Sequence, residues 1–137
     1  MEQTLEREQA IRRWFSMWLT GADTGISTLF ARDCVYIESW GPAYQGSAAV
    51  ARWFEEWNRR GQVLRWEIRQ FFHRDDQTVV EWLFACRTED LGETCFEGLS
   101  LVRFDGEGRI AALQEFGCRL PHYDPYSGGP APRDQEG

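Results

Sequence analysis

The sequence predicts an α+β domain in which helices pack on one face of a curved, mainly antiparallel sheet. Two observations lead to this fold class. Apolar residues before Gly61 recur mostly with the helical period, whereas from Leu64 onward they alternate with a period of two. Short turn sequences then separate four consecutive strand segments, which is typical of an antiparallel meander.

Three helices are expected before the meander. The apolar stripe of the first consists of Ile11, Trp14, Phe15, Trp18 and Leu19. Gly21 ends this helix, and Asp23 or Thr24 can cap a second, short helix. The third helix is expected to have Ser47 as its cap and to close at Gly61. Its apolar stripe consists of Val50, Trp53, Phe54 and Trp57.

Strands are expected on both sides of the third helix. A β-branched and aromatic run over residues 34–37 precedes that helix and predicts one strand. The meander strands are expected at residues 64–73, 78–88, 94–105 and 109–118. The expected order is therefore helix, helix, strand, helix and then four strands.

The chain length of 137 residues suffices for one domain, which we place at residues 1–120. Residues 121–137 contain all but one of the 5 prolines, so we expect a flexible Pro/Gly-rich tail there. Fifteen basic residues, all of them arginine, against 22 acidic residues give a net charge of -7. This excess of negative charge argues against nucleic acid and against an anionic membrane as partners.

No segment is long and apolar enough to cross a membrane, and the acidic start has no signal-peptide core. We therefore expect a soluble cytoplasmic protein. The 4 cysteines form no CxxC pair and the 2 histidines lie far from them in the sequence, so we expect no metal site. In a reducing compartment the cysteines are expected as free thiols, although Cys86 and Cys95 could face each other across a hairpin.

A series of short segments follows the aromatic first helix in a specific order. They are Gly21-Ala22-Asp23, residues 29–35, the helix start at 46–50, and residues 102–106 leading into 108–110. In this order and spacing, residues 8–118 resemble the nuclear transport factor 2-like superfamily, and most of all its SnoaL-like polyketide cyclase and ketosteroid isomerase-like branches. The resemblance implies a cone-shaped sheet wrapped around a long N-terminal helix, an enclosed apolar pocket, and a homodimer.

Glu38 follows the first expected strand. In the isomerase-like pattern this position holds the carboxylate that moves a proton next to a carbonyl group, so the resemblance implies a catalytic Glu38. An apolar cavity would raise the pKa of such a carboxylate and strengthen it as a base. The alternative is a solvated glutamate beside the turn Trp40-Gly41-Pro42.

Glu115 lies on the last expected strand, where SnoaL-like cyclases place an acidic residue that acts as general acid or base. The resemblance therefore implies a catalytic Glu115. Alternation along a strand puts Leu113 and Glu115 on the same face, so both point into the pocket if either does. Alternatively, Glu115 lies on the outer face and pairs with an arginine such as Arg103.

The sequence departs from the isomerase-like pattern at both of its hydrogen-bond donors. Trp14 stands where that pattern has a tyrosine, and Ser100 where it has a protonated acid. An indole N–H and a hydroxyl can donate hydrogen bonds but are less acidic, which argues against a true steroid isomerase. The epoxide-hydrolase pattern requires an arginine between two carboxylates, and no arginine is found at that place.

Aromatic side chains are abundant, with 7 tryptophans among them, and could line a cavity for a flat, largely apolar ligand. Trp53 and Phe54 are interpreted as ordinary core. The residues expected to contact the ligand are Trp14, Trp18, Tyr36, Trp40, Trp57, Phe96, Ser100 and Leu113.

Three functions remain open on the sequence alone. The first is a cofactor-free enzyme that uses Glu115, with Glu38, as proton shuttle in a cyclisation or isomerisation of an apolar carbonyl compound. The second is a binding module in which the two glutamates only orient a small apolar ligand. The third is an assembly subunit whose outer sheet face pairs with another chain. We favour the first of these.

Overall fold

The computed structural model describes residues 2–127 of the chain. Its helices are α1 (Glu2–Thr20), α2 (Ile26–Leu29) and α3 (Ser47–Arg60). Its strands are β1 (Phe30–Ile37), β2 (Ala43–Gln45), β3 (Gly61–Arg74), β4 (Gln77–Thr88), β5 (Gly92–Phe104) and β6 (Ile110–Arg119).

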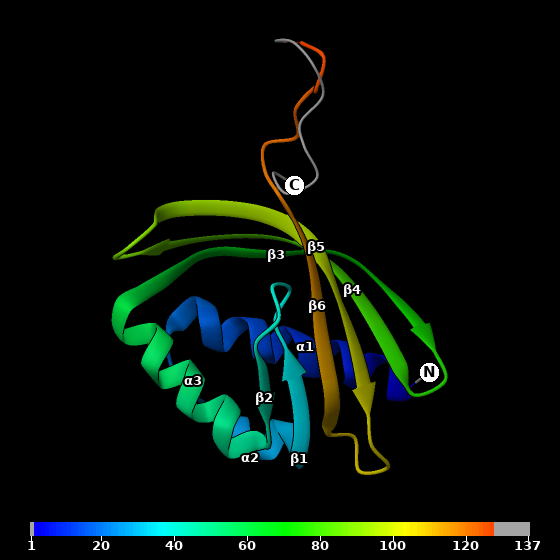
Figure 1. The fold of residues 1–137 in the computed structure, drawn as a ribbon. Helices are drawn as coiled ribbons and strands as arrows, with labels where there is room; N and C mark the ends of the chain where they lie inside the picture. The colour runs from blue at the N-terminus through cyan, green and yellow to red at the C-terminus, as the bar shows by residue number, and fades with distance from the viewer. Residues whose placement is uncertain (1, 128–137) are drawn as a thin grey trace.

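All the strands form one six-stranded sheet in the order β2-β1-β6-β5-β4-β3. The pairing is antiparallel except between β1 and β6, which run parallel. The long strands β3 to β6 arch over α1, while α3 lies along the side of the fold next to β1 and β2 (Figure 1). The two outermost strands do not pair with each other, so the sheet curves around the helix without closing. The predicted α+β fold is confirmed.

The strand predictions are close to the structure for the meander and incomplete before it. Each of the four meander strands is found within three residues of its expected bounds. β1, in contrast, begins at Phe30 rather than at residue 34, and its register with β6 shifts between Phe30 and Val35. β2 was not expected, because three residues carry no periodicity; its position is set by pairing with β1, with Tyr36 opposite Tyr44.

The helix ends show which capping predictions hold. The prediction that Asp23 or Thr24 caps α2 is wrong: Gly25 occupies the N-cap position, with no side-chain capping bond. Asp23 Oδ1 still accepts hydrogen bonds from the backbone N–H groups of Gly25 and Ile26 at the start of this helix. The prediction for Ser47 is wrong: Gly46, at a φ of 92°, occupies the N-cap position of α3, and there is no side-chain capping bond. Gly61 follows α3 with extended backbone and begins β3 directly.

The core lies between α1 and the concave face of the sheet. Trp14 is fully buried and packs edge-on against Trp18, Phe30 and Tyr36. Phe15 stacks on Trp66 of β3, with ring centroids 3.8 Å apart, which ties the helix to the sheet. Leu19, expected in the apolar stripe, is 43% exposed. It lies in the last turn of α1, where the neighbouring Trp18 is buried, and Met17 is a further buried residue of this helix.

The remaining sequence expectations concern the cysteines, membrane segments and tail. All 4 cysteines are free thiols; Cys86 lies opposite Thr94, and Cys95 lies opposite Ala85. Within residues 2–127, no helix has the length and apolar character needed to cross a membrane. The structure describes the expected tail only as far as Ser127, where a turn joins Ser127 N–H to Asp124 O. Residues 128–137 lie outside the described part of the chain.

Candidate active site

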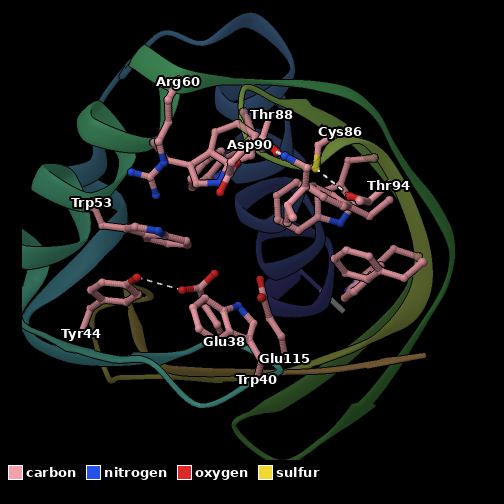
Figure 2. A pocket seen from close by; sticks show the side chains of 17 residues that line it. Glu38, Trp40, Tyr44, Trp53, Arg60, Cys86, Thr88, Asp90, Thr94 and Glu115 are labelled. Atoms are coloured by element: carbon pink, nitrogen blue, oxygen red, sulfur yellow. Dashed lines mark hydrogen bonds between the residues drawn. The ribbon is translucent and has the colours of Figure 1, made fainter. Parts of the chain in front are cut away.

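A cavity of about 390 Å³ opens between the helices and the concave face of the sheet. Aromatic rings from α1, α3 and the strands form most of its wall, and the carboxyl groups of Glu38 and Glu115 point into it (Figure 2). The aromatic lining residues are Trp18, Trp40, Tyr44, Trp53, Trp57, Trp66, Trp82, Phe84 and Phe96. Apolar concave sites with a few converging polar groups are typical of small-molecule binding.

Glu115 reaches the cavity from β6. Alternation along this strand buries Leu113 and leaves Phe116 half exposed on the opposite face, so Glu115 points inward together with Leu113, which is one of the two orientations that the sequence left open. Its Oε2 accepts a hydrogen bond of 2.5 Å from the hydroxyl of Tyr36 on β1. The alternative pairing with Arg103 on the outer face is not found, because no arginine or histidine of the described residues forms an ion pair with Glu115.

Glu38 reaches the same cavity from the turn between β1 and β2. Its backbone N–H donates to Pro42 O, and its O accepts from Gly41 N–H, which closes the turn tightly. The Tyr44 hydroxyl, on the short strand β2, donates to Glu38 Oε2 at 2.8 Å. Tyr44 in turn stacks on Trp53 of α3, with ring centroids 4.5 Å apart. Glu38 is therefore held at the cavity wall rather than solvated beside the turn.

Burial changes the acidity of both carboxyl groups. Desolvation raises the pKa of Glu115 to about 8; the hydrogen bond from Tyr36 opposes the rise and the charge of Glu38 adds to it. Desolvation also raises the pKa of Glu38, while the Tyr44 hydroxyl and the charge of Arg60 limit that rise. Glu115 is thus mainly protonated near neutral pH. Two carboxyl groups with different pKa values in one cavity can serve as an acid and a base.

The cavity mouth carries further polar groups. Arg60, the last residue of α3, points toward the cavity and lies across it from Glu38 (Figure 2). Asp90 also lines the mouth, in the turn between β4 and β5. Inside, the Cys86 thiol lies 3.3 Å from Thr94 Oγ1, and desolvation raises its pKa. A thiol of raised pKa is a poor nucleophile at neutral pH, so the carboxyl groups are the reactive candidates.

Six of the ten residues singled out from the sequence line the cavity: Trp18, Glu38, Trp40, Trp57, Phe96 and Glu115. The other four, Trp14, Tyr36, Ser100 and Leu113, lie behind its wall in the packed core, each at most 2% exposed. Trp14 Nε1 donates to the Tyr36 hydroxyl, and Ser100 Oγ accepts from Trp82 Nε1. The two groups at the isomerase donor positions are therefore engaged with core partners instead of facing the cavity.

Several lining residues were not identified from the sequence. Trp53, interpreted as core, lines the cavity, and so do Arg60 and Asp90 at its mouth. The strand contributions could have been found by extending the alternation from Phe96. The inward faces of β4 and β5 supply Trp82, Phe84, Cys86, Thr88, Thr94 and Phe96 at every second position.

Neither histidine lines the cavity. His73 on β3 contacts Glu8 of α1 at 2.7 Å and Thr78 at 2.9 Å, and it joins the start of α1 to the sheet. His122 contacts Glu97. Among residues 2–127 there is no group of three histidine, cysteine, aspartate or glutamate side chains arranged to hold a metal ion.

A comparison with protein-family models matches residues 11–113 to the SnoaL-like domain, which is most of the chain. The chain belongs to the SnoaL-like domain family. The comparison with curated proteins finds no match. The family assignment agrees with the arrangement of α1, α3 and the curved sheet around one cavity.

Solved structures support the same fold at low sequence identity. One is a hypothetical protein of ketosteroid isomerase-like fold from Catenulispora acidiphila, in complex with trimethylamine; it is 21% identical over 89% of this chain and 94% of that chain, with a TM-score of 0.67. An LEH-like epoxide hydrolase from M. tuberculosis is 15% identical over 83% of this chain and 84% of that chain, with a TM-score of 0.73. An NTF2-like protein from Burkholderia xenovorans is 13% identical over 83% of this chain and 90% of that chain, with a TM-score of 0.70.

Proposed function

We propose that this chain binds a small, largely apolar carbonyl compound in the aromatic cavity and catalyses a proton transfer on it. Glu115 is the general acid and Glu38 the second proton-transfer group, in a cyclisation or isomerisation that needs no cofactor. The observation that carries the proposal is the Glu115 carboxyl group, which faces an aromatic cavity without an ion-pair partner among the described residues. An acid held neutral near pH 7 can protonate a carbonyl oxygen.

The chemistry follows from the placement of the two glutamates. Glu38, held at the cavity wall by the Tyr44 hydroxyl, is the second carboxyl group and removes a proton next to the carbonyl. Glu115 then gives its proton to the carbonyl oxygen, and the enol forms without an unstabilised enolate. Aromatic walls exclude water and hold a flat ring between them. The epoxide-hydrolase alternative is not favoured, because the arginine that lines the cavity, Arg60, forms no ion pair with either glutamate.

Hydrogen–deuterium exchange of a generic ketone tests this proposal without knowledge of the natural substrate. We choose 2-tetralone, a flat bicyclic ketone, and follow the exchange of its α-hydrogens in D2O by NMR against the rate without protein. Wild-type protein is expected to accelerate the exchange, and Glu115→Gln to reduce the acceleration by about 100-fold or more. Glu6→Gln, on an exposed position of α1, is the control and should exchange like wild type. A Glu115→Gln variant with full activity would refute the proposal.

A non-catalytic binding module is the second candidate, and the trimethylamine bound to the Catenulispora protein supports small-molecule binding by this fold. It predicts saturable chemical-shift changes with 2-tetralone but no acceleration of exchange. In that case the glutamates orient the ligand rather than transfer a proton.

We also propose that two copies of this chain form a homodimer through the outer face of the sheet. An assembly subunit would use the same face. Leu99 and Leu101 of β5 and Phe116 of β6 are large apolar side chains exposed on that face, and Leu99 lies directly opposite Phe116. Sedimentation at rising concentration tests the dimer, and a species that stays monomeric would contradict it.

The four free thiols support a reducing location, and we propose the cytoplasm.

A further inference from the structure

Trp14, Tyr36 and Glu115 are joined by two consecutive hydrogen bonds. Trp14 Nε1 of α1 donates to the Tyr36 hydroxyl at 3.2 Å, and the Tyr36 hydroxyl donates to Glu115 Oε2 at 2.5 Å. Trp14 and Tyr36 are both 0% exposed and do not line the cavity, whereas Glu115 does. The connected groups therefore run from the buried core to the reactive carboxyl group.

Both hydrogen bonds donate toward Glu115. An indole N–H can only donate, so the Tyr36 oxygen is the acceptor of the first bond. The hydroxyl has a single proton, and that proton is then donated to Glu115 Oε2. A carboxylate oxygen that accepts a hydrogen bond is less basic than one that does not, so Oε2 is the poorer site for a proton. No described residue donates to Oε1.

We propose that Trp14 and Tyr36 are positioning residues for Glu115: they direct its acidic proton to Oε1 and leave that oxygen to exchange protons with the ligand. The inference rests on the proposed function, since it specifies which Glu115 oxygen performs the proton transfer. It assigns to Trp14 and Tyr36 a role different from the ligand contact expected from the sequence.

The proton transfer from Glu115 to the ligand leaves the protonation state of Tyr36 unchanged. When the ligand oxygen takes the proton, the Oε1–H bond breaks, its electron pair stays on the carboxylate, and a ligand O–H bond forms. The negative charge that develops on the carboxylate strengthens the hydrogen bond from Tyr36, which lies in the buried core where such bonds are strong. Desolvation and the neighbouring Glu115 raise the pKa of Tyr36 well above its ordinary value, so Tyr36 keeps its proton throughout. Tyr36 is therefore a positioning residue and not the acid.

Tyr44 and Arg60 influence the pKa of Glu38, and the charge of Glu38 in turn influences the pKa of Glu115. The charge of Glu38 opposes ionisation of Glu115. Tyr44 and Glu38 form a second tyrosine–glutamate pair in the same cavity, at 2.8 Å. That pair provides a matched control, because Tyr44→Phe removes the same kind of hydroxyl–carboxylate hydrogen bond but leaves the bonds from Trp14 to Tyr36 and from Tyr36 to Glu115 in place.

The test is a pH titration of the Glu115 carboxyl carbon by NMR in protein labelled with [5-13C]glutamate, with the signal assigned by its loss in Glu115→Gln. Tyr36→Phe removes the hydrogen bond to the carboxylate and is expected to raise the titration midpoint by about one to two pH units. Trp14→Phe leaves the Tyr36 hydroxyl without its donor and should raise the midpoint by a smaller amount. Tyr44→Phe should not raise it.

Phe30→Leu controls for loss of packing, because Phe30 contacts the rings of both Trp14 and Tyr36 but takes no part in the hydrogen bonds. If Tyr36→Phe leaves the Glu115 midpoint unchanged or lowers it, the proposal is wrong. If Trp14→Phe moves the midpoint no further than Phe30→Leu does, Trp14 has no positioning role. A wild-type Glu115 that titrates near its ordinary value but still rises in Tyr36→Phe supports the positioning role while contradicting the proposed neutral acid.

Discussion

Replacing Glu115 by glutamine should make the protein more stable at neutral pH. The folded protein holds this group at a pKa of about 8, against an ordinary value of 4.5. Between these two values the unfolded chain is ionised while the folded chain must keep or acquire a proton. The free energy of unfolding therefore falls as pH rises, by up to about 1.4 kcal/mol per pH unit.

The magnitude follows from the same shift. The stabilising contribution of the neutral acid is fully present below pH 4.5 and is lost as pH rises to about 8, a total of about 5 kcal/mol. At pH 7 the loss amounts to about 3 kcal/mol. These figures are upper bounds, because Glu115 is only partly shielded from water. Glutamine is neutral at every pH and can still accept the Tyr36 hydrogen bond, so the variant avoids the loss.

Urea unfolding followed by tryptophan fluorescence at a series of pH values from 5 to 9 measures this directly. The wild-type and Glu115→Gln free energies should nearly coincide at pH 5 and diverge in favour of the variant toward pH 8. Glu6→Gln, exposed on α1, is the surface control and should follow wild type. Curves for wild type and Glu115→Gln that run parallel over the whole range would refute the reasoning, since they would show that Glu115 has the same pKa in both states.

Three further outcomes are expected. Tyr44→Phe should raise the pKa of Glu38, measured by carboxyl NMR, because the Tyr44 hydroxyl lowers that pKa; a lower pKa would contradict the assignment. Gly98→Ala should lower stability by about 2 kcal/mol or more in urea unfolding, since its Cβ would lie 2.1 Å from the backbone oxygen of Phe116; Gly106→Ala, in open space, is the control, and an equal effect of both would argue against the packing. Phe116→Arg should convert the proposed dimer to monomer in sedimentation, and an unchanged mass would exclude that face.

The fold could be predicted because its signals are local and repeated. The stripe of Ile11, Trp14, Phe15 and Trp18 specifies α1, and the change to a period of two specifies the meander. The parallel pairing of β1 with β6 could not be predicted, because it joins segments on opposite ends of the domain and has no local pattern. The same holds for β2, which is only three residues long.

The sequence indicated which side chains point inward from the strands. It did not indicate which of them line the cavity and which are buried behind its wall. Alternation placed Glu115 on the same face as Leu113, and the resemblance to known families singled out both Glu115 and Glu38. Neither distinguishes a side chain that lines a cavity from one that packs behind it, since both point inward. Tyr36 and Trp53 illustrate this: Tyr36, expected in the cavity, is fully buried behind its wall, while Trp53, expected in the core, lines the cavity beside Tyr44.

The central claim is that Glu115 remains a neutral acid inside the cavity at neutral pH. Infrared difference spectroscopy of wild type against Glu115→Gln tests it most directly, because a protonated carboxyl group has a C=O stretching band that a carboxylate lacks. We expect a protonated carboxyl band at pH 6 that is present in wild type, missing in the variant, and lost from wild type by pH 10. A carboxylate signal for Glu115 already at pH 6 would contradict the claim.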